Sequence, residues 1–72
     1  MMIANLTVKR DGHHYRYTLE RDDQLVAREM SIDRGRALEI VQSNPDGAVV
    51  DGELTFEGMP AAWTWQATVE MS

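Results

Sequence analysis

Hydrophobic and polar residues alternate with a period of two along most of the chain, which is the pattern of half-buried strands. Two such runs cover residues 2–9 and 13–20, and Asp11-Gly12 between them suits a tight hairpin turn. The face of these runs that we expect to be buried holds Met2, Ala4, Leu6, Val8, His13, Tyr15, Tyr17 and Leu19. The first two elements are therefore predicted to form a β-hairpin.

A third short run covers residues 25–30, after the turn residues Asp22-Asp23-Gln24. Both of its faces mix polar and apolar side chains, so its register is ambiguous. This ambiguity is typical of an edge strand, in which an inward-pointing Arg28 discourages pairing with another chain.

The period changes to that of a helix between Ser31 and Asn44. Its apolar stripe consists of Ala37, Leu38, Ile40 and Val41. Ser31 or Asp33 is the candidate N-cap, and Pro45 ends the helix because it disfavours helical geometry at the preceding residue.

Two further strands are predicted, over residues 48–57 and 61–71. In the first, Val50, Leu54 and Phe56 share one face, and Val49, Asp51, Glu53, Thr55 and Glu57 share the other. Gly52 within this run indicates a bulge or a close approach by another element. In the second, Trp63, Trp65, Ala67, Val69 and Met71 share one face.

The elements follow the order β-β-β-α-β-β in one domain of residues 1–72. We therefore predict an α+β fold with a single, mainly antiparallel sheet and one helix packed on one face. Five strands of about seven residues form a face of roughly 24 by 23 Å. A helix about 16 Å long and about 10 Å wide covers about a third of it. Either a second protein molecule covers the rest, or the sheet curls enough to bury it under its own helix.

Charge is distributed unevenly along the chain. All seven Lys and Arg residues lie at or before Arg36, together with six acids, whereas residues 37–72 contain six acids and no Lys or Arg. This split, within a net charge of −5, predicts a near-neutral side and an acidic side. Because the chain has no cysteine, membrane-spanning apolar run or signal-peptide pattern, we expect a cytoplasmic protein whose core depends on packing.

Candidate catalytic groups are sparse. Adjacent His13 and His14 point to opposite faces of a strand and so do not readily chelate one ion; we expect His13 to be partly buried and His14 to be solvated. Asp51, Glu53 and Glu57 are predicted to form a solvent-facing row rather than an acid–base pair. Phosphate-binding glycine loops and nucleophile motifs do not occur in the sequence. We therefore expect a non-enzymatic protein with no cofactor and no metal.

Weak nucleic-acid binding is one alternative, with Lys9, Arg16, Arg34 and Arg36 as its candidate residues. Tyr15 and Tyr17 belong to the opposite, core-directed face, so they do not form a base-stacking platform beside these residues. The net charge of −5 also opposes binding to a polyanion, which makes nucleic acid an unlikely partner.

The favoured hypothesis is a protein-interaction module that binds another protein with a basic surface. Its candidate binding residues are Asp51, Glu53, Glu57, Trp63 and Trp65. The tryptophan pair is typical of a core, but a face too wide for the helix makes one ring a candidate for an interface. A specific version is a small phage-type or mobile-element-type inhibitor that blocks a nucleic-acid-binding protein by charge mimicry. The remaining alternative is a structural homo-oligomer, such as a homodimer, joined through apolar sheet surface.

Overall fold

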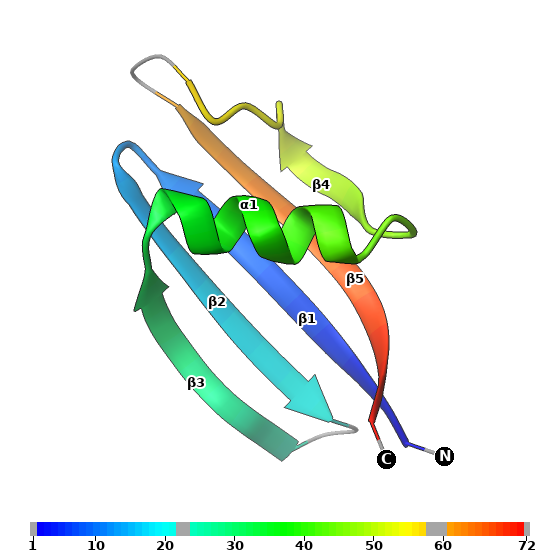
Figure 1. Cartoon of the computed structure of the whole chain (residues 1–72). Coiled ribbons are helices and arrows are strands. Elements are labelled where there is room, and N and C mark those ends of the chain that lie inside the picture. Colours follow the sequence, from blue (N-terminus) through cyan, green and yellow to red (C-terminus); the bar gives the residue numbers. More distant parts are fainter. Residues whose placement is uncertain (1, 22–23, 58–60, 72) are drawn as a thin grey trace.

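Five antiparallel strands and one helix form the fold in a computed structural model that describes residues 2–21, 24–57 and 61–71 (Figure 1). In chain order the elements are β1 (Met2–Asp11), β2 (His14–Arg21), β3 (Gln24–Ile32), α1 (Arg34–Ser43), β4 (Ala48–Gly52) and β5 (Ala62–Met71). The strands lie in the order β3-β2-β1-β5-β4, so β1 is central and pairs with β2 and β5. The predicted fold class and element order are confirmed. None of the described helical residues form a helix long and apolar enough to cross a membrane.

The hairpin between β1 and β2 turns one residue later than expected. Asp11 pairs with His14, so the loop consists of Gly12 and His13. Gly12 has a φ of 65°, a left-handed conformation that glycine adopts without steric cost. His13 is exposed in this turn, and the expectation that it is partly buried on a strand is wrong, because the turn takes it out of the alternation.

Alternation along the long strands places the core as predicted. The buried apolar residues of β1, β2 and β5 are Ala4, Leu6, Val8, Tyr15, Trp63, Trp65 and Ala67. They share one face of the sheet because their positions are paired across the strands, as Val8 is with both Tyr17 and Trp65. We call this the apolar face and the opposite one the open face.

β3 lies at one edge of the sheet, as its mixed pattern predicted. Its pairing with β2 is irregular on both sides of Leu19, which is a feature of edge strands that limits further strand pairing. The side chain of Arg28, to which the sequence assigned the same role, lies outside the described residues.

Helix α1 carries the chain from the β3 edge to the β4 edge across the apolar face (Figure 1). Asp33 is its N-cap: the carboxylate accepts a hydrogen bond from the backbone N–H of Arg36 at 2.7 Å. Within the helix, Ala37 and Ile40 are buried and belong to the core cluster. The two edge strands β3 and β4 are four strand spacings apart, a distance of about 19 Å. The helix is about 15 Å long and spans this distance together with its flanking residues.

The fourth strand is shorter than the sequence predicted. β4 ends at Gly52, whose φ of 79° turns the backbone out of the sheet. A Cβ at Gly52 would lie 2.3 Å from the carbonyl oxygen of Ala62, so β5 approaches closely here, as the glycine indicated. The pairing also shifts between Val49 and Asp51, which leaves Val50 exposed instead of facing the core.

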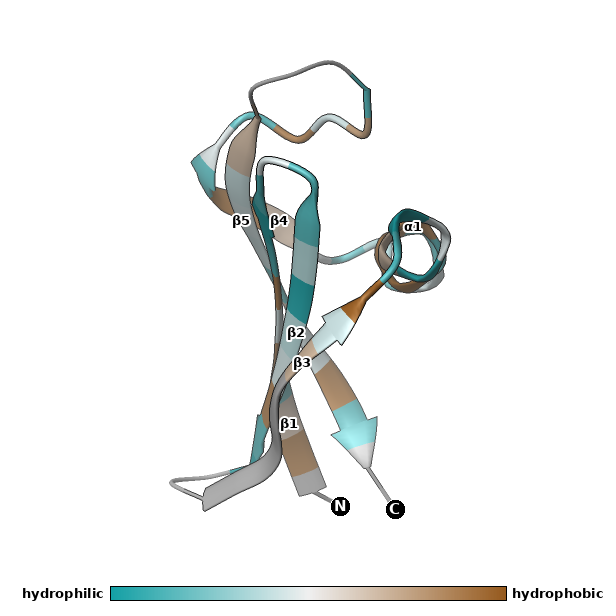
Figure 2. Ribbon diagram, turned by 90° about the vertical axis from the view of Figure 1, so that its left-hand side faces the viewer, coloured by the Kyte–Doolittle hydropathy of each residue, from teal (hydrophilic) through white to brown (hydrophobic). Residues whose placement is uncertain are grey.

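Two different segments cover the apolar face. Figure 2 shows α1 end-on, on one side of the sheet, with the open face bare of helix. Beyond the helix, Phe56 of the segment after β4 packs against the same core cluster. Tyr15, Trp63 and Trp65 are each no more than 4% exposed in the single chain. Helix and segment together therefore bury the large aromatic side chains, a role that the sequence pattern had not assigned to residues 53–57.

Two glycines provide a test of this backbone path. In Gly52→Ala, the added methyl group meets backbone atoms in a left-handed conformation, so we expect a loss of about 1–3 kcal/mol in the free energy of unfolding, measured by urea titration. The control is Gly35→Ala in the first turn of α1, where the nearest atom is Asp33 Oδ1 at 3.5 Å. It should raise stability by up to about 1 kcal/mol. Equal stability of Gly52→Ala and wild type would contradict the turn at Gly52.

Candidate protein-binding surface

The predicted binding tryptophans lie inside the protein. Trp63 and Trp65 are each 2% exposed, and Trp63 Nε1 donates a hydrogen bond to the carbonyl oxygen of Thr55 at 2.7 Å. Both rings belong to the core cluster under α1 and residues 53–57. They are therefore not part of the surface that a single chain offers to a partner.

Arg10 is a buried charged residue that the sequence analysis did not identify. It is 5% exposed and lies on the apolar face of β1, at the position that follows Val8 in the alternation. Its Nε donates to the carbonyl oxygen of Gly12 at 2.8 Å, and its Nη1 donates to that of Thr55 at 2.7 Å. The guanidinium also lies 5.2 Å from the centre of the Tyr15 ring. These contacts compensate for the loss of hydration.

The same contacts determine where the segment after β4 lies. The carbonyl oxygen of Thr55 accepts hydrogen bonds from both Arg10 and Trp63. Next to it, the Phe56 ring stacks on Tyr15 at 6.0 Å and meets Trp63 edge-on at 5.4 Å. The backbone of residues 53–57 is thereby held against the sheet, and Glu53 and Glu57 are positioned with it.

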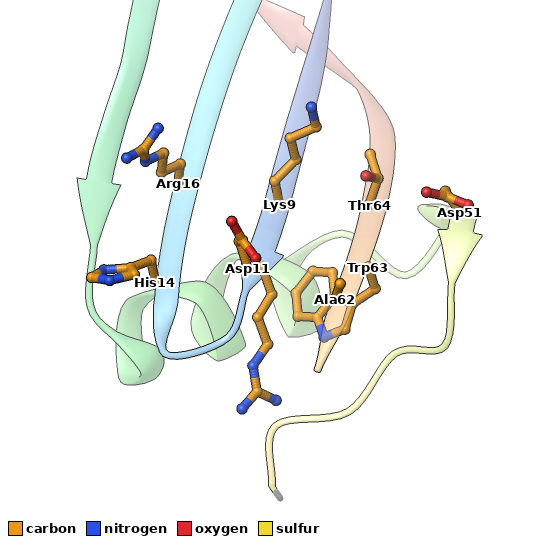
Figure 3. Close-up of a pocket in the computed structure, with 9 residues that line it drawn as sticks. Lys9, Asp11, His14, Arg16, Asp51, Ala62, Trp63 and Thr64 are labelled. Atoms are coloured by element: carbon orange, nitrogen blue, oxygen red, sulfur yellow. The ribbon is translucent and has the colours of Figure 1, made fainter. Parts of the chain in front are cut away.

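The three predicted carboxylates do not form one row. Asp51 is in β4, where it pairs with Thr64 and lies on the open face (Figure 3). Glu57 lies beyond the strand, with Oε1 4.0 Å from Arg34 Nη2 at the start of α1. The row prediction is wrong because alternation stops at Gly52, where the strand ends. All three side chains are nevertheless exposed, as predicted.

Residues 46–57 include the edge strand β4 and the segments on either side of it. This stretch combines exposed charged side chains with exposed apolar ones. Its exposed carboxylates, which we call the acidic rim, are Asp46, Asp51, Glu53 and Glu57. Three of the five large apolar side chains that are exposed among the described residues also lie here: Val49, Val50 and Leu54. The stretch contains no Lys or Arg. It is the most strongly charged continuous stretch of the sequence after Arg36.

The four basic residues considered for nucleic-acid binding are divided between the two sides of the sheet. Lys9 and Arg16 are direct cross-strand neighbours on the open face. Arg34 and Arg36 belong to α1 on the other side, and Arg36 is paired with Glu39 one turn along the helix. They therefore do not form one continuous basic surface.

Two hollows occur at the hairpin end of the molecule. The one on the open face, of about 320 Å³, is lined by residues that include Lys9, Asp11, His14, Arg16 and Asp51 (Figure 3). The second, of about 540 Å³, lies at the start of α1 and is lined by Arg10, His13, Tyr15, Asp33, Arg34, Phe56 and Glu57. Within the described ranges, no three His, Cys, Asp or Glu side chains are grouped so that they could hold a metal ion.

Comparisons with known proteins add no relative: no protein-family model, curated protein or solved structure matches the chain.

Arg10 provides a test of how the acidic rim is positioned. Arg10→Met removes both donors to backbone carbonyls, so we expect a loss of about 1–3 kcal/mol in the free energy of unfolding. We also expect faster cleavage by a glutamate-specific protease after Glu53 and Glu57, because the segment loses its contact with the sheet. The control Arg36→Met removes an exposed arginine and should change stability by less than about 0.5 kcal/mol. Unchanged cleavage of the Arg10 variant would contradict the anchoring role.

Proposed function

We propose that this chain is a non-enzymatic protein-interaction module that binds a basic surface of another protein through the acidic rim. The observation that carries the proposal is the composition of residues 46–57. Four exposed carboxylates and three exposed apolar side chains lie in a stretch without a basic residue. Surfaces that combine a charged border with apolar contacts are typical of protein interfaces.

The uneven charge distribution supports a basic partner. The rim belongs to the half of the chain that has six acids and no Lys or Arg, and the ion pair between Glu57 of the rim and Arg34 is exposed and weak. Residues 46–57 themselves carry four acids and no Lys or Arg, and this negative charge attracts cationic surfaces. Complementary charge of this kind accelerates association and orients the partner before contact.

The edge position of β4 favours contact through side chains. β4 has five residues, a shift in register between Val49 and Asp51, and a left-handed glycine at its end. Short and irregular edge strands resist the addition of another strand. Val49, Val50 and Leu54 instead supply apolar area that becomes buried when a partner covers the rim.

A nucleic-acid-binding protein is the partner class that we propose more specifically. Such proteins carry basic surfaces that bind phosphates, and the exposed carboxylates of the acidic rim compete for the same surface. The chain then acts as an inhibitor that occupies the binding surface, a role that needs no catalytic group.

A charge-matched pair of variants tests the proposal. The rim variant combines Asp51→Asn, Glu53→Gln and Glu57→Gln, and the control variant combines Glu20→Gln, Glu39→Gln and Glu70→Gln. A basic protein is first captured from the native host on the wild-type chain, identified by mass spectrometry and purified. Its dissociation constant is then measured against all three forms by calorimetry at two salt concentrations.

We expect the rim variant to bind about tenfold more weakly and the control variant to bind like wild type, because three attractive charges are lost only from the rim. Higher salt should weaken wild-type binding more than binding by the rim variant. Equal affinities of the rim and control variants would refute the assignment to the rim.

A further inference from the structure

The most exposed large apolar side chain in the described part of the chain lies at the β4 edge of the sheet. Val50 is 56% exposed, and the register shift between Val49 and Asp51 leaves it without a pairing partner on β5. A bulge of this kind turns a side chain out of the regular alternation. Leu54, beyond the turn at Gly52, is also exposed. Apolar area is therefore open to water at this edge, and a bound partner would bury it.

Carboxylates lie on both sides of this apolar area. Asp51 is on the open face (Figure 3), whereas Glu57 is on the opposite side of the sheet, beside Arg34 at the start of α1. Glu53 lies between them in the chain, next to Leu54. A group that binds here therefore contacts apolar side chains and carboxylates at the same time.

We propose that the acidic rim binds arginine in preference to lysine, so that the basic surface of the partner is an arginine-rich segment. A guanidinium is more weakly hydrated than an ammonium group, and it can therefore lie against apolar side chains such as Val50 and Leu54. Its planar fork of donors pairs with a carboxylate through two parallel hydrogen bonds, while its methylene groups cover apolar area. The inference rests on the proposed function and specifies the chemistry of the partner.

The apolar side chains are what distinguishes the two cations. Arginine and lysine carry the same charge, so exposed carboxylates alone attract both to a similar degree. An ammonium group is a compact, strongly hydrated point charge, and burying apolar surface beside it removes part of its water. Val50 and Leu54 should therefore determine the preference, and the carboxylates should determine the strength of binding to both cations.

Two blocked nonapeptides, which repeat Arg-Ala-Ala or Lys-Ala-Ala three times, test the proposal in nuclear magnetic resonance titrations at constant ionic strength. With the arginine peptide we expect saturable shifts of the backbone amides of residues 49–54. It should bind about fivefold more tightly than the lysine peptide, because only the guanidinium pairs with the carboxylates while lying on apolar surface.

Variants separate the apolar contribution from the charge. Val50→Ser, and Val50→Ser combined with Leu54→Ser, should reduce the preference for the arginine peptide to about twofold or less, because apolar contact area is lost. Asp51→Asn combined with Glu53→Gln should weaken binding of both peptides to a similar degree. The control Ile3→Ser, at an exposed apolar position near the start of β1, should leave both affinities unchanged.

Three results would overturn the proposal: equal affinity for the two peptides, the absence of saturable shifts with the arginine peptide, and an unchanged preference in both serine variants. Equal binding of the peptides at residues 49–54 would leave the proposed function standing, since a basic partner would still be attracted. The proposed function fails separately, when the rim and control variants bind the captured protein equally well.

Discussion

The carbonyl oxygen of Thr55 is the point on which the arrangement of this protein depends. It accepts one hydrogen bond from Arg10 on the central strand and another from Trp63 on the neighbouring strand. A guanidinium is costly to bury without acceptors, and an indole N–H in a core requires a partner. The segment after β4 provides the acceptor for both. In return, Phe56 lies against Tyr15 and Trp63 and completes the aromatic cluster.

This arrangement determines which surfaces remain for binding. One short helix cannot cover a five-stranded sheet alone, and residues 53–57 cover the part near the hairpin. The large aromatic side chains are consequently buried in a single chain. What remains accessible is the polar open face and the acidic boundary along β4. The proposed function concerns the acidic boundary.

Periodicity predicted most of the fold because the long strands bury one face each. The alternation in β1, β2 and β5, the Asp33 cap and the edge position of β3 all follow from local pattern. Arg10 was missed although alternation places it on the apolar face after Val8. A charged guanidinium is normally exposed, and Arg10 is buried only because two backbone carbonyl oxygens accept its hydrogen bonds. One of these acceptors is 45 residues away in the chain, so the local pattern does not reveal it.

The candidate surface was less predictable than the fold. Leu54 and Phe56 continue an apparent alternation beyond Gly52, so the strand seemed longer than it is, and Asp51, Glu53 and Glu57 seemed to form one row. A single left-handed glycine changes the direction of the backbone, and the carboxylates diverge from there. The acidic character of residues 37–72 was evident from composition, whereas the positions of their carboxylates in space depend on the turn at Gly52. The division of the basic residues between both sides of the sheet likewise required the cross-strand register.

Hydrogen exchange of the Trp63 indole N–H, followed by nuclear magnetic resonance over a range of protein concentrations, tests the central claim most directly. The signal is assigned by its loss in Trp63→Phe. If Thr55 accepts this proton inside a single chain, exchange is slow and independent of protein concentration. Fast exchange at every concentration, or protection that appears only as concentration rises, would show that the segment does not cover the sheet in the single chain.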